Sequence, residues 1–120
     1  VSELISSYAW DTALNFICQT NSAGYILATT SSSSYGNIGT DSKQNTGAYS
    51  VDNYSNIHDL LGNCNEWTTE YNSISSSYTV VFRGGVYNYY SGIYAAGRNQ
   101  HNGIIYSGPS LTFRVQLYVK

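Results

Sequence analysis

The sequence contains little charge. Lysine and arginine number 5, aspartate and glutamate 7, and the formal net charge is −2. Proteins that bind nucleic acid concentrate positive charge, because the phosphate backbone attracts them electrostatically. We therefore expect no nucleic-acid partner. We also expect no membrane insertion, because no apolar run approaches the roughly 20 residues of a spanning helix, and the first residues lack a secretory-signal pattern.

Cysteine is scarce as well. Cys18 and Cys64 are the only two, too few for a disulfide framework. Cys18 falls in a predicted helix and Cys64 in a predicted buried turn, so two unreactive core thiols are favoured over a bridge. His58 and His101 are the only histidines and have no partners at metal-ligand spacing. We expect His58 to be a hydrogen-bonded structural residue.

Tyrosine, by contrast, is abundant, with 13 residues in a chain of 120. A tyrosine gives rigid contact area with a polar tip, which binding surfaces use heavily. The segment 86–110 holds five Tyr, four Gly, three Asn and three Ser, and no Lys, Glu, Asp, Trp or Met. This composition favours a recognition loop. A tyrosine-rich loop without a fixed partner is the alternative.

A helix is predicted to begin at Ser7 and to end before Gly24. Apolar residues recur in it at positions i, i+3, i+4 and i+7, which places them on one face toward a core. Ser6 or Ser7 can cap the first turn. The apolar stripe consists of Trp10, Ala13, Leu14 and Ile17.

Strands are predicted in the second half of the chain. Residues 79–82 form a short apolar run that leads into Arg83-Gly84-Gly85. Along 111–119, apolar and polar residues alternate, which predicts a strand with one buried face. Residues 1–5 are expected to pair with this last strand and cover its edge, unless a neighbouring chain does so. The buried face would carry Leu111, Phe113, Val115, Leu117 and Val119.

Two polar segments, 29–56 and 68–78, lack apolar periodicity and are expected to be ordered loops. Between them, residues 56–67 are too apolar for a solvent loop and too interrupted by Gly62 for a single helix or strand. A compact buried turn fits this pattern, with Gly62 supplying a backbone conformation closed to other residues. The candidate anchors of the first loop are Tyr35, Ile38, Tyr49 and Val51.

The buried turn also carries a motif. The pattern N-x-x-D-L-x-G-N-x-x-E-W at 56–67, followed by R-G-G at 83–85 and F-R-V at 113–115, resembles the signature of the formylglycine-generating enzyme (sulfatase-modifying factor) family. The resemblance covers nearly the whole chain. It implies an α+β, C-type-lectin-like fold with a few short antiparallel strands, one main N-terminal helix and long ordered loops. It also implies that residues 1–120 are a single domain, the C-terminal part of a longer one.

The resemblance does not extend to the chemistry of the family. Its oxidation of a sulfatase cysteine depends on two copper-binding cysteines shortly after R-G-G, and Tyr89 and Tyr94 stand at the matching positions. Tyrosine does not replace the soft thiolate ligands that copper takes there. No nucleophile-elbow motif supports a hydrolase either. We therefore expect no enzyme activity and no required cofactor. An oxidase of the formylglycine-generating type, or another enzyme of the family, is the alternative.

A structural calcium site is a second implication of the resemblance. Oxygen ligands from a rigid loop suit calcium. The carboxylate concerned, that of Glu66, can equally pair with Arg83 or Arg114, because a buried charge needs either a partner or a metal. The ligands in this sequence would be the backbone carbonyls of Leu61, Gly62 and Cys64 and the side chain of Glu66.

Two further points concern the family positions. Asn65 stands where the family has Trp before the glutamate, which changes the local packing. Arg83, Arg98 and Arg114 match family arginines, and we expect them to bridge loops through forked hydrogen bonds.

A branch of this family serves as the variable proteins of diversity-generating retroelements, in which adenine mutagenesis turns Asn-type codons into Tyr, Ser, Gly, Ile or His. The segment 86–110 consists largely of these residues and lies where the resemblance places the variation. We therefore expect a non-catalytic ligand- or receptor-binding domain. The expected binding residues are Tyr87, Asn88, Tyr89, Tyr90, Ile93, Tyr94, Asn99, His101, Asn102, Ile104 and Tyr106.

The expected setting follows from that function. The ligand would be a cell-surface protein or glycan, and the location extracellular, on a phage tail fibre, a virion or a bacterial cell surface. Other chains of a larger fibre or surface assembly would be its neighbours. A structural module of a virion or surface protein is the second alternative.

Overall fold

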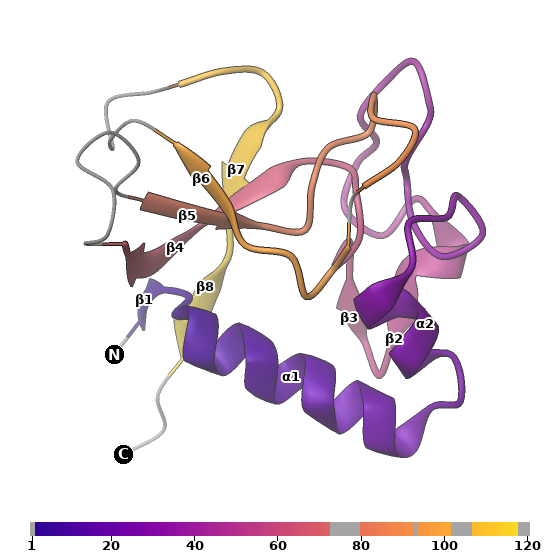
Figure 1. Cartoon of the computed structure of the whole chain (residues 1–120), viewed down its shortest axis with the longest axis horizontal. Coiled ribbons are helices and arrows are strands. Elements are labelled where there is room, and N and C mark those ends of the chain that lie inside the picture. Colours follow the sequence, from indigo (N-terminus) through magenta and orange to yellow (C-terminus); the bar gives the residue numbers. More distant parts are fainter. Residues whose placement is uncertain (1, 73–79, 93, 102–106, 118–120) are drawn as a thin grey trace.

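The computed structural model describes residues 2–72, 80–92, 94–101 and 107–117. It is a mixed α+β structure in which the long helix α1 (Ser7–Thr20) lies beside small sheets and α2 (Gly24–Thr29) packs near its end (Figure 1). A turn of 3-10 helix spans Ser50–Asp52. The strands are β1 (Ser2–Leu4), β2 (Asn53–Tyr54), β3 (Ile57–His58), β4 (Asn65–Tyr71), β5 (Val80–Arg83), β6 (Asn99–His101), β7 (Leu111–Phe113) and β8 (Val115–Leu117).

The largest sheet has the strand order β6-β5-β4-β7. β5 runs antiparallel to both β4 and β6, whereas β7 runs parallel to β4, so the expectation of purely antiparallel strands is wrong for that pair. Two small antiparallel pairs, β1–β8 and β2–β3, flank this sheet. The mixed α+β class is confirmed, and the C-type-lectin-like assignment stays a prediction.

The predicted first helix is confirmed. It begins at Ser7, and the Ser6 hydroxyl caps it by accepting a hydrogen bond of 3.1 Å from the amide of Ala9. Trp10, Leu14 and Ile17 are buried, as the apolar stripe predicts. The short helix α2 was not predicted, since six residues with one apolar contact face carry little periodic signal. None of the helices in the described part of the chain has the length and apolar character needed to cross a membrane.

The long loop 29–56 is attached to the core at fewer points than expected. Ile38 is buried in the main apolar cluster, and Tyr35 packs against that cluster. Tyr49 is only half-buried, and Val51 is exposed, so Val51 is not an anchor. Further along, the predicted buried turn is confirmed, because Leu60 and Leu61 are enclosed in the cluster. The predicted loop 68–78 is wrong up to Tyr71, since β4 extends through that residue.

The predicted last strand is the main correction. It is divided at Arg114 into β7 and β8, which belong to different sheets. Its faces are also inverted: Phe113, Val115 and Leu117 are 67%, 55% and 76% exposed, while Thr112, Arg114 and Gln116 are half-buried. We name the three exposed residues the β7–β8 apolar patch. Leu111 is half-buried, and Val119 lies outside the described residues.

The prediction for the N-terminus holds. β1 pairs antiparallel with β8, with Ser2 opposite Leu117 and Leu4 opposite Val115. The backbone edge of β8 is therefore covered on that side by residues of the same chain. β1 and β8 therefore lie side by side in Figure 1.

Candidate functional site

The loop that follows β5 is attached to the rest of the molecule by its main chain. The amide of Gly39 donates to the carbonyl of Tyr89 at 2.7 Å, and the amide of Thr40 donates to that of Tyr87 at 2.9 Å. The amide of Tyr87 in turn donates to the carbonyl of Asn63 at 3.1 Å. The near half of this loop is thus fixed by peptide groups, whatever side chains it carries.

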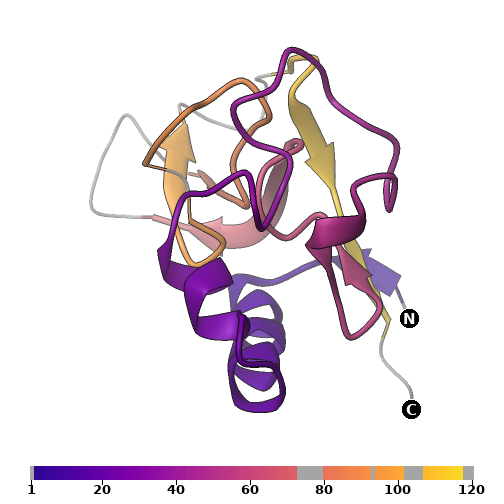
Figure 2. The same cartoon turned by 90° about the vertical axis from the view of Figure 1, so that its right-hand side faces the viewer.

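The far half of the loop is fixed in the same way against the helices (Figure 2). The amides of Ala95 and Ala96 donate to the carbonyls of Leu27 and Ala28 in α2, at 3.4 and 3.2 Å. The indole Nε1 of Trp10 donates to the carbonyl of Ala95 at 2.8 Å. Ala95 is fully buried, so its small side chain is the part of this half that the core constrains.

Most polar and aromatic side chains of this loop are exposed, whereas those of Val86 and Ala95 are buried. Tyr89, Tyr90 and Tyr94 are exposed, as are Asn88 and Asn99, and Tyr87 is half-buried. His101 ends β6, and its side chain is not described. Of the predicted binding residues, Ile93, Asn102, Ile104 and Tyr106 lie outside the described residues.

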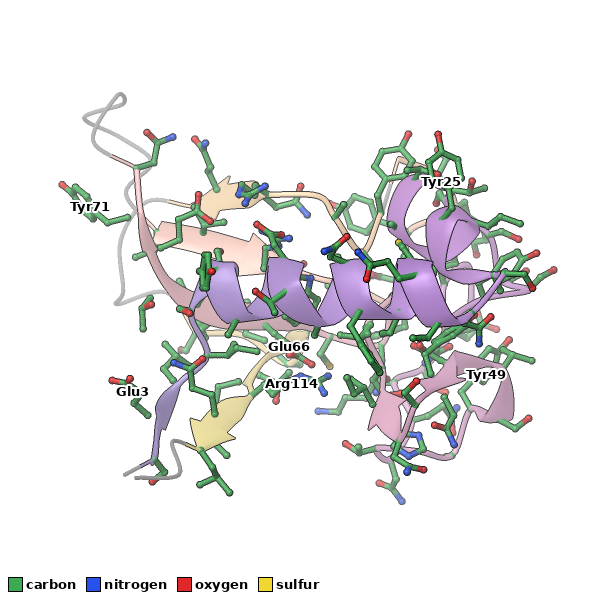
Figure 3. All side chains as sticks on the ribbon, turned by 90° about the horizontal axis from the view of Figure 1, so that it is seen from below. Glu3, Tyr25, Tyr49, Glu66, Tyr71 and Arg114 are labelled. Carbon is green, nitrogen blue, oxygen red and sulfur yellow. The ribbon has the colours of Figure 1, made fainter. Side chains whose placement is uncertain are left out.

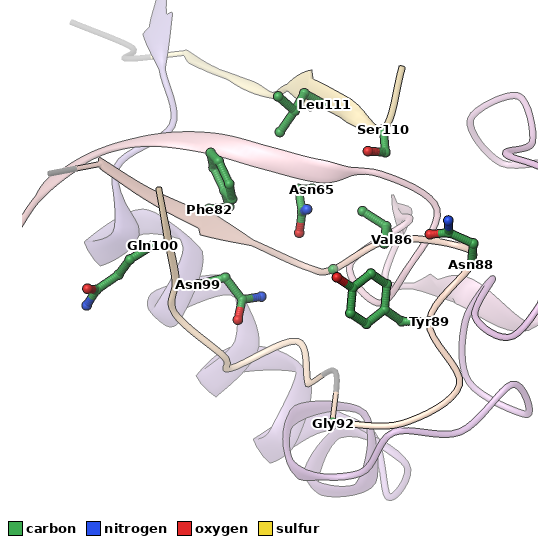
Figure 4. A pocket seen from close by; sticks show the side chains of 11 residues that line it. Asn65, Phe82, Val86, Asn88, Tyr89, Gly92, Asn99, Gln100, Ser110 and Leu111 are labelled. Carbon is green, nitrogen blue, oxygen red and sulfur yellow. The ribbon is translucent and has the colours of Figure 1, made fainter. Parts of the chain in front are cut away.

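A groove of about 460 Å³ opens between this loop and the central sheet (Figure 4). Its floor comes from all four strands of the sheet, through Asn65, Phe82, Asn99, Gln100 and Leu111, and Val86, Asn88, Tyr89 and Ser110 add to its walls. The structure therefore brings three of the predicted residues, Asn88, Tyr89 and Asn99, into one cavity. Tyr87, Tyr90 and Tyr94 do not line it.

Of the residues on the floor of the groove, sequence reasoning predicted only Asn99 as a binding residue. Asn65 was recognised only as a departure from a motif, and its small polar side chain now lies in the middle of the cavity, with Oδ1 buried and without a hydrogen-bond partner. Phe82 is held beside it by an edge-to-face contact with Trp67, with ring centroids 4.4 Å apart. Gln100 and Ser110 gave no signal, because they are distant from Asn65 in the sequence.

No described residue in the lining of the groove is a Lys, Arg, Asp, Glu or His. The lining instead offers the carboxamides of Asn65, Asn88, Asn99 and Gln100, the Ser110 hydroxyl and two aromatic rings. Such a set binds and orients a ligand by hydrogen bonds and contact.

Next to Asn65 on β4, Glu66 pairs with Arg114 (Figure 3). Arg114 Nε and Nη2 donate to the two carboxylate oxygens at 2.8 and 2.7 Å, and Nη2 also donates to the carbonyl of His58 at 2.7 Å. Burial raises the pKa of Glu66, and Arg114 opposes that rise. The alternative that Glu66 pairs with an arginine is confirmed, with Arg114 and not Arg83 as the partner.

This pairing affects the predicted calcium site at Leu61, Gly62, Cys64 and Glu66. Both oxygens of its single charged ligand are engaged with a guanidinium, so a calcium ion would have to displace Arg114. In the described part of the chain, no group of three or more His, Cys, Asp or Glu residues is placed to hold a metal. The calcium site stays a prediction.

Of the other two arginines, Arg98 makes the expected forked contact, whereas Arg83 donates through Nη2 alone and its buried Nε and Nη1 have no partner among the described residues. Arg83, fully buried, and Arg98, exposed, both donate to the carboxylate of Asp11, and Arg98 Nε donates to Glu70 at 3.1 Å. The guanidinium carbons of Arg83 and Arg114 lie 5.6 and 5.7 Å from the centroid of the Trp10 ring, within cation–π distance. These contacts connect α1 to the sheet.

Two buried carboxyl groups lie at the base of the β2–β3 hairpin. The amide of Asp59 donates to the carbonyl of Asp52 at 3.3 Å, and each side chain has a buried Oδ1 without a partner. The pKa of Asp52 is raised to about 7, chiefly by burial; the amide of Leu61 opposes this rise and the nearby Asp59 adds to it. His58 Nδ1 is also buried without a partner, so the expectation of a fully hydrogen-bonded His58 is wrong for that atom.

The two cysteines are free, as predicted, although both are half-buried rather than enclosed in the core. Burial raises the pKa of the Cys64 thiol. Since the thiolate is the reactive form, this shift keeps Cys64 unreactive.

Comparison with known proteins places the fold. No protein-family model and no curated protein matches the chain. Among solved structures, it is similar to the crystal structure of CarF, with a TM-score of 0.68, and to Treponema denticola variable protein 1, with a TM-score of 0.59. Each is 16% identical, and the match covers 95% of this chain and 46% of the other, so the chain spans less than half the length of either. The fold is shared. Membership of the formylglycine-generating enzyme family is not shown.

Proposed function

We propose that this chain is a non-catalytic binding module of the variable-protein type, in which a C-type-lectin-like scaffold presents the residues of 86–101 to a ligand. The observation that carries the proposal is how this loop is fixed. Its attachments at 87, 89, 95 and 96 are main-chain hydrogen bonds, whereas its tyrosines are exposed. A loop built in this way keeps its course when its exposed side chains change.

The comparisons support the same function. One of the two structural neighbours is, by its printed name, a variable protein. The groove beside the loop contributes hydrogen-bonding and aromatic groups without acid–base residues, which also favours binding over catalysis. Tyr89 and Tyr94 at the positions of the family's copper ligands argue against the oxidase alternative.

The setting proposed with this function is the outside of a cell or virion. The ligand would be a cell-surface protein or glycan, and the module would belong to a phage tail fibre or another surface assembly together with other chains. Neither a catalytic cofactor nor a membrane-inserted segment is part of the proposal.

Binding is tested with the fluorescently labelled chain on a panel of bacterial and animal cells. The triple variant Tyr89→Ser, Tyr90→Ser, Tyr94→Ser should lose cell binding while keeping its Tm. The matched control replaces three exposed tyrosines outside the loop, Tyr8, Tyr25 and Tyr71, and should bind like the wild type. Equal binding by both triple variants, or no binding to any cell, would contradict the proposal.

Variability is tested separately. Deep sequencing of the gene from a growing population should show substitutions confined to adenine positions in codons 86–110. A window as uniform as the flanking scaffold would rule out diversification and leave a fixed binding module.

A further inference from the structure

The groove beside the loop has a chemistry that narrows the class of its ligand, on the condition that the chain is the binding module proposed above. Among the residues that the structure describes, its lining contains no Lys, Arg, Asp, Glu or His. A charged ligand group placed there would lose hydration without gaining an opposite charge, which is costly. The lining therefore disfavours phosphate, sulfate, carboxylate and ammonium groups.

Four carboxamides provide most of its polar atoms, from Asn65, Asn88, Asn99 and Gln100. Each carboxamide carries an acceptor oxygen and a donor nitrogen side by side. A ligand that matches several such pairs must itself both donate and accept at neighbouring atoms, and adjacent hydroxyl groups on a sugar ring do so.

Asn65 further indicates that the ligand should carry a hydrogen-bond donor. Its Oδ1 is buried at the floor of the groove without a hydrogen-bond partner (Figure 4). Buried polar atoms without partners are uncommon in native structures and call for an explanation. Once the carboxamide turns toward the groove, a hydroxyl or amide N–H of a ligand would satisfy this oxygen.

The apolar part of the groove fits the same ligand. The rings of Phe82 and Tyr89 face the cavity together with Asn65. A pyranose ring has hydroxyls at its edge and an apolar C–H face, so it can form hydrogen bonds with carboxamides while packing against an aromatic ring. The volume of about 460 Å³ lies within the range of roughly 300–1,000 Å³ seen for small-ligand sites. A protein epitope, by contrast, needs about 800 Å² of contact on each side.

We infer that the groove binds a neutral saccharide unit, such as the terminal hexose or N-acetylhexosamine of a surface glycan. The ligand stacks on Tyr89 and forms a hydrogen bond with the carboxamide of Asn65. No calcium ion is needed, because the groove lining contains no carboxylate to hold one.

The test is a glycan array that carries neutral and anionic oligosaccharides, probed with the labelled chain in EDTA. The chain should be retained on at least one neutral glycan, and the same free oligosaccharide should compete. Asn65→Ala should weaken this binding roughly three- to tenfold, the effect of one lost hydrogen bond. Tyr89→Ala should weaken it as well. Asn53→Ala, which changes an exposed asparagine outside the groove, is the matched control and should have no effect.

Retention on anionic glycans alone, on no glycan, or equally by Asn65→Ala and wild type would overturn the inference. Chemical treatment of the cells that the module binds distinguishes a failure of the saccharide inference from a failure of the proposed binding function. Periodate, which cleaves vicinal diols, should abolish binding. Cell binding that depends on the loop tyrosines but survives periodate and is lost after protease treatment would show a protein ligand, so the saccharide inference would fail while the binding function stands.

Discussion

Arg114 holds Glu66 from a position 48 residues further along the chain, through two parallel hydrogen bonds of 2.8 and 2.7 Å. The carboxylate is almost entirely buried, and the guanidinium is the group that neutralises it. The same guanidinium reaches the carbonyl of His58 and lies over the ring of Trp10. One side chain thus connects β3, β4 and the helix α1.

Removing this arginine should be costly. Arg114→Ala leaves a buried carboxylate without a partner, and we expect a loss of about 3–5 kcal/mol in the free energy of unfolding, measured with urea. Arg114→Lys should lose less, because it keeps the charge but not the fork. The control is Arg98→Ala, which removes an exposed pair and should cost about 1 kcal/mol or less. Equal losses for the two alanine variants would contradict the role assigned to Arg114.

Asp52 should make the protein less stable as the pH rises. Its pKa is raised from 3.8 to about 7 in the folded protein, chiefly by burial, so the folded state holds a proton that the unfolded state releases earlier. The stabilisation is fully present below pH 3.8 and is lost as the pH rises through about 7. It amounts to about 4 kcal/mol at most. Asp52→Asn should therefore be more stable than wild type at pH 8 and should flatten the pH dependence of urea unfolding. An unchanged slope between pH 5 and 8 would exclude Asp52 as the source.

Truncating a side chain of the β7–β8 apolar patch should hardly change the free energy of unfolding. Leu117 is largely exposed, so Leu117→Ala should change the free energy of unfolding by no more than about 0.5 kcal/mol. The same substitution at the fully buried Leu61 should cost about 2–5 kcal/mol. Thermal or urea unfolding of the two variants compares the same Leu→Ala substitution at an exposed and at a buried position. A large loss at Leu117 would restore the face assignment predicted from the sequence.

A comparison of Gly62 with Gly92 distinguishes the steric cost of an added Cβ from the cost of holding a non-glycine residue at positive φ. Gly62 and Gly92 both have positive φ, at 82° and 77°. A Cβ on Gly62 would lie 2.2 Å from the carbonyl oxygen of Asn37, whereas a Cβ on Gly92 has nothing within 4 Å. Gly92→Ala should cost only about 1–2 kcal/mol, the penalty for a left-handed residue. Gly62→Ala should cost clearly more or prevent folding. Similar unfolding free energies for the two would refute the close packing of the turn against Asn37.

The sequence predicted best what depends on local spacing. The helix that begins at Ser7 and its buried face follow from the spacing of the apolar residues, which only a helix satisfies. Its cap follows from the residue type of Ser6. The alternation along 111–119 was also real, but it defines two faces without telling which one is inside. The polar face lies inward because Arg114 pairs with Glu66 and with the carbonyl of His58, and both residues are distant from it in the sequence.

The groove shows the same limit at the site. Asn88 and Tyr89 in its wall were predicted from composition, because composition is local. Its floor depends on Asn65, Phe82, Gln100 and Leu111 coming together from four strands, and that arrangement depends on strand order. Only Asn65 carried a signal, as an unexpected residue within a motif. Its meaning becomes clear once the cavity above it is seen.

Because Trp10 donates a hydrogen bond to the carbonyl of Ala95, its fluorescence can report whether the loop is attached to the helix. Indole emission moves to longer wavelength when the ring meets water, and Trp10 is fully enclosed, whereas Trp67 is half-buried. If residues around Ala95 lifted from the core, Trp10 would lose both its hydrogen-bond acceptor and part of its cover. A red shift in emission that precedes global unfolding would therefore record detachment of the loop without any added label.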